Sequence, residues 1–99
     1  MKKFRILIKG ENFFMRSEGA VRRFGFYTTR FAEAQDEAEA ERGVVEALRQ
    51  EGQLRGRVLN DRSDPPMLFA EKIVEIASFE GVETRTPGLA FYEDRPPAH

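Results

Sequence analysis

The sequence predicts an α+β fold: a mostly antiparallel four- to five-stranded sheet with one α-helix packed on one face, in the order β-β-α-β-β(-β). Three observations lead to this fold class. Several segments alternate apolar and polar residues as half-buried strands do, and one segment has helical spacing between capping signals. The chain has 99 residues, enough for one domain and too few for two. We therefore predict a single domain over residues 1–94 and a flexible tail over residues 95–99.

The first two strands are predicted to form an antiparallel hairpin. Alternation within residues 3–9 indicates a strand with one buried face, which continues past a bulge near Gly10. One side of this strand carries Phe4, Ile6 and Ile8, and the other carries Arg5, Leu7 and Lys9. Residues 16–20 have turn chemistry, and residues 21–31 have the composition of a second strand. The short connection favours antiparallel pairing.

A single helix follows the hairpin. Asp36 is the predicted N-cap because its carboxylate can accept a hydrogen bond from the first turn, and Glu39 completes a capping-box pattern. The apolar residues at helical spacing are Ala38, Ala40, Val44, Val45 and Leu48. Arg49 falls in the last turn, where a positive charge interacts favourably with the helix dipole, and Gly52 is the predicted residue just past the end.

The rest of the chain is predicted to complete the sheet. Residues 54–59 form a short strand, residues 60–66 a proline-containing loop, and residues 67–79 a long strand. Residues 89–92 are a candidate for a short edge strand. Because one helix covers only part of one face, we expect the other face to meet either solvent or a partner.

Composition restricts the classes of function. The chain has no cysteine, which excludes disulfides and thiolate metal sites. Arg5 and Lys9 interrupt the apolar N-terminal run well before the usual length of a signal peptide, and no window approaches the length of a membrane span. We therefore expect a cytoplasmic protein that has no cofactor and does not bind membranes.

Charge is unevenly distributed, although the formal net charge is only −1. Residues 1–30 carry eight basic and two acidic side chains, a net charge of +6, whereas residues 31–51 carry two basic and seven acidic side chains, a net charge of −5. Two interpretations fit this pattern. Basic strands attract an acidic helix packed beside them, or a basic sheet face binds an anionic partner.

Residues 22–31, RRFGFYTTRF, run close to the RNA-recognition signature K/R-G-F/Y-G/A-F-V-x-F/Y. The position of the segment argues against that family, because the signature follows the first of two helices there and precedes the only helix here. Aromatic rings beside arginines can still stack on unpaired bases. The candidate residues for such binding are Arg22, Arg23, Phe24, Phe26 and Arg30. The competing interpretation is that these phenylalanines belong to the core beneath the helix.

No other segment predicts catalysis or a metal site. Glu71 and Glu75 share a strand face but lie about 13 Å apart at ~3.3 Å per residue, too far for joint acid–base chemistry on one bond. Residues 60–64 offer oxygen ligands, but Pro65 stands where a calcium loop needs glycine. The only histidine is His99. We predict no catalytic residue and no metal ligand.

Three stretches of sequence suggest a relationship to known proteins: RILIKGENFF, FGFYTTRF with the Ala/Glu-rich helix after it, and LNDRSDPPMLFAEKI. Together they resemble a family of small bacterial proteins to which we attach no activity. The resemblance covers residues 3–80 and implies a bacterial, cytoplasmic origin. It transfers no catalytic or binding residue to this chain.

For function, we expect a non-enzymatic protein-interaction module that forms a homo-oligomer, in the simplest case a homodimer. The reason is that one helix leaves apolar sheet area uncovered, which contact with a second chain would bury. The alternative is single-stranded nucleic-acid binding through the basic aromatic hairpin, residues 2–31.

Overall fold

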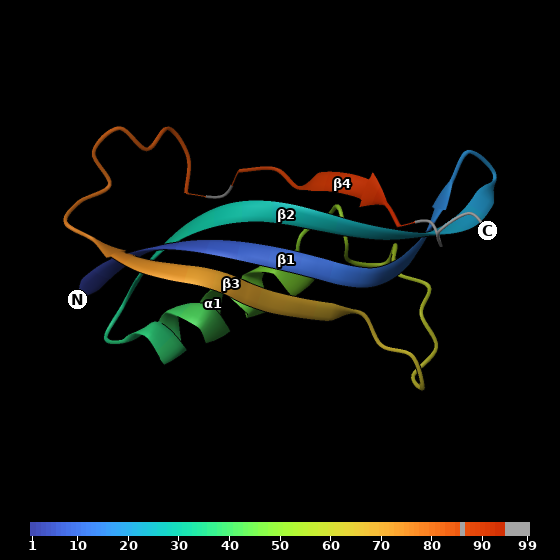
Figure 1. Ribbon diagram of the computed structural model, residues 1–99, viewed down its shortest axis with the longest axis horizontal. Coiled ribbons are helices and arrows are strands. Elements are labelled where there is room, and N and C mark those ends of the chain that lie inside the picture. The colour runs from blue at the N-terminus through green and yellow to red at the C-terminus, as the bar shows by residue number, and fades with distance from the viewer. Residues whose placement is uncertain (86, 95–99) are drawn as a thin grey trace, which may run out of the picture.

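The computed structural model describes residues 1–85 and 87–94, and Figure 1 shows its strands and helix in chain order. These elements are β1 (Lys2–Ser17), β2 (Ala20–Ala34), α1 (Glu37–Arg49), β3 (Met67–Ile76) and β4 (Ala90–Glu93). The strands form one antiparallel sheet in the order β3-β1-β2-β4. The predicted α+β class and the order β-β-α-β-β are confirmed. The predicted tail, residues 95–99, lies outside the described residues.

The hairpin of β1 and β2 spans the length of the molecule (Figure 1). Its turn consists of Glu18 (φ 52°) and Gly19 (φ 81°), two consecutive left-handed residues, a combination whose twist matches that of the flanking strands. The register shifts between Gly10 and Phe13, where Asn12 also has a positive φ of 62°. The bulge predicted near Gly10 is therefore confirmed.

Residues 54–59, predicted as a strand, instead form turns and irregular chain after α1. Backbone N–H groups there bond to carbonyls three or four residues back, as in Arg55 N–H to Glu51 O at 2.7 Å. Gly56 has a φ of 76°, which lies outside the extended region of regular strand residues. Leu54 is buried in the core, so its side chain anchors the loop to the core instead of forming part of a strand.

Side-chain amides hold the loop after residue 59 against the bulge of β1. Asn60 Oδ1 accepts a hydrogen bond from Phe14 N–H at 2.9 Å, and Asn60 Nδ2 donates to the Asn12 carbonyl at 2.7 Å. Asn12 Nδ2 in turn donates to Asp64 Oδ1 at 2.8 Å. These bonds satisfy backbone groups of β1 just beyond Glu11, where its pairing with β3 ends. The polar residues of this loop therefore have a structural role.

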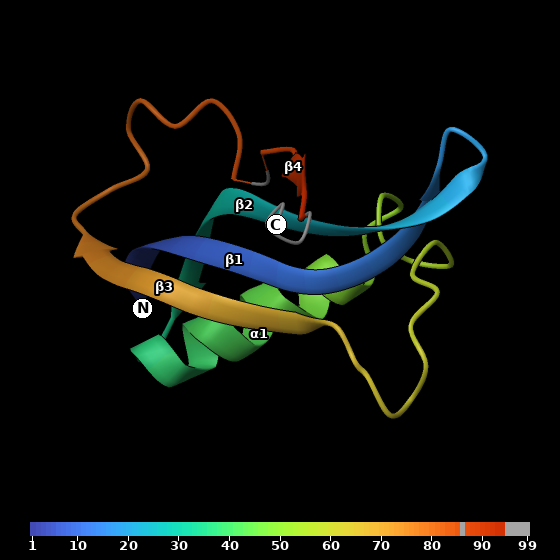
Figure 2. The same cartoon turned by 45° about the vertical axis from the view of Figure 1, so that its right-hand side comes forward.

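The core lies between α1 and one face of the sheet (Figure 2). Asp36 caps the helix as predicted, with its Oδ1 accepting from Glu39 N–H at 2.8 Å. The helix buries Ala40, Val44 and Leu48. The sheet side chains in the same core are Phe4, Ile6, Ile8, Phe13, Phe26 and Ala34.

The opposite face of the sheet is here called the open face. In strand order from β3 to β4, the residues assigned to it by alternation and pairing register are Met67, Phe69, Lys72, Val74, Ile76, Lys3, Arg5, Leu7, Lys9, Glu11, Tyr27, Thr29, Phe31, Glu33, Ala90 and Tyr92. Part of one end is covered by Phe79, whose ring contacts Phe31 at 6.3 Å between centroids. The helix lies on the other side, which agrees with the expectation that it covers one face.

Candidate functional site

Two of the five residues predicted for nucleic-acid binding are buried on the helix side of β2. Phe26 is 0% exposed and packs against Phe13, with ring centroids 5.2 Å apart. Arg30 is 3% exposed; it forms an ion pair with Glu51, and its Nε donates to Thr28 Oγ1 at 3.1 Å. Neither side chain can reach a base or a phosphate from this position, and Phe26 serves the core as the competing interpretation predicted.

The other three predicted residues hold β4 against the hairpin. Arg22 forms an ion pair with Glu93 at 3.3 Å, and Arg23 forms one with Asp94 at 3.3 Å. Phe24 is half-buried and meets the ring of Phe91 edge-on, at 6.3 Å between centroids. Arg22, Arg23 and Phe24 therefore have a structural role. Because β4 has only four residues, it forms few backbone hydrogen bonds with β2, and these side-chain contacts help to hold it in place.

The open face carries a different group of aromatic residues. Tyr27 and Tyr92 lie side by side, with ring centroids 5.9 Å apart and planes inclined by 31°. They are 40% and 39% exposed, respectively, and Phe69 on β3 is 37% exposed. Gly25 makes the arrangement possible, because a Cβ there would overlap the Tyr92 ring. Burial raises the pKa of the Tyr92 phenol, so this ring stays neutral at physiological pH.

Lys9 sits at the centre of this aromatic group. It lies opposite Tyr27 on β2 and opposite Phe69 on β3, and its Nζ is 5.7 Å from the centroid of the Tyr27 ring. Its ion pair with Glu11, 2.9 Å long, raises the pKa of the ammonium group. Lys9 therefore remains positively charged over the whole physiological range.

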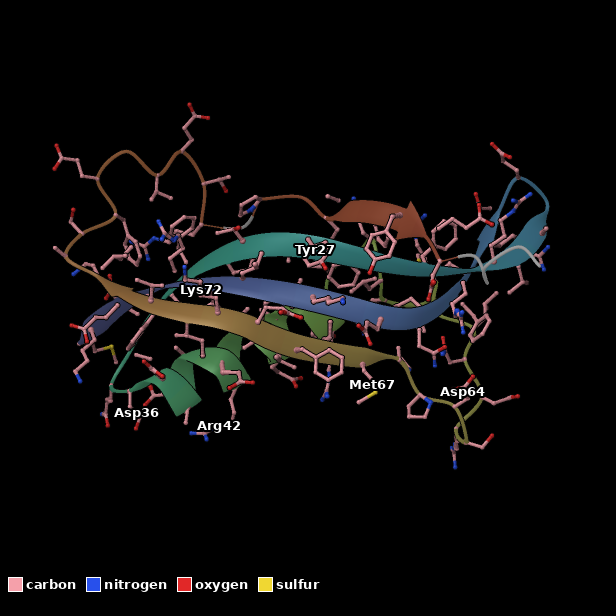
Figure 3. All side chains as sticks on the ribbon, in the orientation of Figure 1. Tyr27, Asp36, Arg42, Asp64, Met67 and Lys72 are labelled. Atoms are coloured by element: carbon pink, nitrogen blue, oxygen red, sulfur yellow. The ribbon has the colours of Figure 1, made fainter. Side chains whose placement is uncertain are left out.

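A shallow hollow of about 170 Å³ adjoins this group on the open face. Its lining residues are Arg5, Leu7, Thr29, Lys72 and Val74. Arg5 and Lys72 place two cationic side chains beside an apolar floor. Figure 3 shows Tyr27 and Lys72 over the front of the sheet, whereas α1 with Arg42 passes behind it.

The two sides of the sheet differ in charge. Within the open face, Lys3, Arg5, Lys9 and Lys72 are the basic residues, and Glu11 and Glu33 are the acidic ones. The acidic residues of α1 are Glu37, Glu39, Glu41 and Glu46. The open face thus carries more basic than acidic side chains and lies on the side of the sheet away from the acidic helix. Because these basic side chains lie away from α1, they do not fit the interpretation in which basic strands attract a helix packed beside them, and the binding of an anionic partner stays a prediction.

The strongest sequence signal, the motif of residues 22–31, pointed to two residues that are buried beneath α1 and three that contact β4. Arg5 and Lys9 do follow the alternation of the first strand, so their common face was foreseeable. Tyr92 and Phe69 join them only through pairing of β4 and β3 with distant strands, and no local pattern carries that information.

No family model, curated protein or solved structure matches this chain. The resemblance to a bacterial family therefore stays a prediction. Among the described residues, no helix has the length and apolar character needed to cross a membrane. In the same residues, no group of three or more histidine, cysteine or acidic side chains is placed to hold a metal ion.

Proposed function

We propose that this chain is a non-enzymatic interaction module of the bacterial cytoplasm, and that it forms a homodimer by pairing the β3 strands of two copies. The observation that carries this proposal is the outer edge of β3. β3 lies at the end of the sheet, and among the described residues it pairs with β1 alone (Figure 2). An unpaired strand edge presents N–H and C=O groups that another strand can complete.

The β3 edge is long and partly apolar. The strand has ten residues, against four for β4 at the opposite edge. Met67 is 50% exposed and Phe69 is 37% exposed. A bulge opposite Leu7 and Ile8 interrupts the strand at Glu71, which leaves residues 72–76 as a regular segment for pairing. Antiparallel pairing of this segment with its copy would extend the sheet across two chains.

A second copy is better suited to this edge than to the open face. Face-to-face packing of two open faces would remove Arg5, Lys9 and Lys72 from water opposite the same cations of the other chain. Burying cations that outnumber the acidic groups around them is strongly unfavourable. Edge pairing leaves these side chains in solvent and adds backbone hydrogen bonds.

Sedimentation velocity at micromolar concentration tests this proposal. We expect a species of about twice the chain mass of 11.4 kDa. The variant Val74→Lys places a charge at the centre of the 72–76 segment, close to its own copy in an antiparallel pair, and should yield monomers. Val74→Thr keeps a β-branched neutral side chain and should remain dimeric.

A wild-type chain that sediments as a monomer at every concentration would rule out the homodimer. So would a dimer that Val74→Lys leaves intact, because its interface would then lie elsewhere. Circular dichroism of both variants establishes that the sheet has formed before the masses are compared.

A further inference from the structure

We propose that the open face binds single-stranded nucleic acid, with Tyr27 and Tyr92 stacking on bases and Arg5, Lys9 and Lys72 contacting phosphates. This surface differs from the β3 edge, so the inference does not depend on whether the chain dimerises. It also differs from the residues that the sequence motif singled out, because Phe26 and Arg30 are buried on the other side of the sheet.

The first argument is the exposure of flat aromatic rings. Tyr27 and Tyr92 each leave more than a third of their surface in solvent, and their rings are inclined by only 31°. Two neighbouring, partly exposed rings offer a surface on which unpaired bases can stack. Every base has a π-face, so such stacking is tolerant of sequence.

The second argument is the charge around these rings. Lys9 lies between Tyr27 and Phe69 in the cross-strand register, and the hollow next to it is lined by Arg5 and Lys72. The ion pair with Glu11 raises the pKa of Lys9, so Lys9 is positively charged at neutral pH. A row of cations beside stacking rings matches a polymer that alternates phosphates with bases.

The third argument concerns what the surface disfavours. A duplex keeps its bases stacked on one another and offers none to exposed rings. A second copy of the chain would bring like charges together. The acidic side chains of α1 lie behind the sheet, whereas the open face carries more basic than acidic side chains, so a polyanion is attracted to the open face and repelled from the helix side.

Fluorescence anisotropy with labelled twelve-nucleotide probes tests the inference, using single-stranded DNA, single-stranded RNA and a DNA duplex of about the same length. We expect saturable binding to a single strand at low salt and weaker binding to the duplex. The DNA and RNA probes show which sugar is preferred. With three phosphate contacts, the affinity should fall about 20-fold between about 50 and 200 mM salt.

Variants separate stacking from charge. Tyr27→Leu keeps an apolar side chain and removes the ring, and should weaken binding about tenfold, whereas Tyr27→Phe should bind like wild type. Lys9→Gln should lower the slope of log affinity against log salt by about 0.7. Arg42→Gln removes a positive charge from α1 instead and should change neither affinity nor slope; Arg42 is exposed and lies behind the sheet.

Three results would overturn the inference. The first is no binding of either single strand at low salt by a chain that circular dichroism shows to be folded. The second is equal binding of the duplex combined with no effect of Tyr27→Leu, which would indicate a nonspecific attraction of charge. The third is an equal loss of affinity in Arg42→Gln and Lys9→Gln, which would remove the open face as the site.

Discussion

The ring of Tyr92 on β4 lies against the backbone of Gly25 on β2, in the space that any side chain at position 25 would need. A matching relationship exists on the other face of the sheet, where the Phe26 ring occupies the space beside Gly10 on β1. The two glycines thus admit one aromatic ring to the open face and one to the core. Because the Phe26 ring is in the core and the Tyr92 ring is on the open face, substitution of the two glycines should change the free energy of unfolding by different amounts.

Alanine at the two glycines should have unequal effects. Gly10→Ala forces a methyl group against Phe26, which is fully buried and has nowhere to move, so we expect a loss of about 1–3 kcal/mol in the free energy of unfolding. Gly25→Ala meets Tyr92, which is partly exposed and can swing into solvent, so the loss should be smaller. Urea unfolding of both variants gives the comparison, and an equal or reversed order would contradict the assignment of the two faces.

Glu51 should be essential to the buried Arg30. The Arg30 side chain is 4% exposed, and Glu51 is its ion-pair partner. Glu51→Leu leaves a buried cation without compensation, which should cost about 3 kcal/mol, whereas the double variant Arg30→Met/Glu51→Leu should recover most of that loss. Glu46→Leu is the matched control, since it breaks an exposed pair with Arg49 and should change stability by less than about 0.5 kcal/mol. Thermal and urea unfolding measure the stability of each variant. If the double variant were no more stable than Glu51→Leu, this explanation would be contradicted.

Asn60 should anchor the loop before β3 to the bulge of β1. Asn60→Asp replaces an amide donor by a carboxylate facing the Asn12 and Asp64 carbonyls, with an expected loss of about 1–3 kcal/mol. Hydrogen exchange at the Leu59 amide, which bonds to Phe14 O at 2.8 Å, should accelerate. Ser63→Ala in the same loop serves as the control. Unchanged exchange in Asn60→Asp would show that the loop is held by other contacts.

Stability should decline in alkaline solution partly through Tyr92. Burial raises the pKa of its phenol above the ordinary value of 10.0, and the Glu11 hydrogen bond raises the pKa of Lys9. A group with a raised pKa in the folded state contributes stability that is complete below the ordinary pKa and is lost as pH rises through the raised one. The free energy of unfolding should therefore fall above about pH 10.

Tyr92→Phe provides the check on that decline, because it keeps the ring and removes the ionisable group. Urea unfolding at about pH 8 and about pH 11 should show a shallower decline for this variant than for wild type. Identical declines would assign the alkaline loss to other groups.

The hairpin and helix were predictable because their signals are local. The bulge at Gly10, the turn before residue 20 and the Asp36 cap each depend on residues a few positions apart. The faces of β3 were not predictable. Strict alternation along residues 67–79 would put Phe69 and Ile73 on the same side. The bulge at Glu71 instead puts Phe69 on the open face and Ile73 opposite Ile6 on the helix side. That bulge arises from pairing with β1, some sixty residues earlier in the chain.

The candidate surface was predictable only in part, for the same reason. Alternation in the first strand grouped Arg5 with Lys9. The aromatic motif of residues 22–31 predicted Phe26 as a binding residue, but Phe26 is buried beneath α1 and is not at the surface. Tyr27 follows from the alternation of that strand, but its neighbour Tyr92 comes from a four-residue strand near the end of the described chain.

The central position of β1 has a consequence for synthesis. The ribosome releases β1 first, and β2 and α1 can assemble on it as soon as residue 49 has emerged. The other flank of β1 has no neighbour until β3 is made. During that interval the nascent hairpin exposes an apolar, unpaired flank of the kind that chaperones recognise, so the rate at which residues 50–76 are translated would govern how long that exposure lasts.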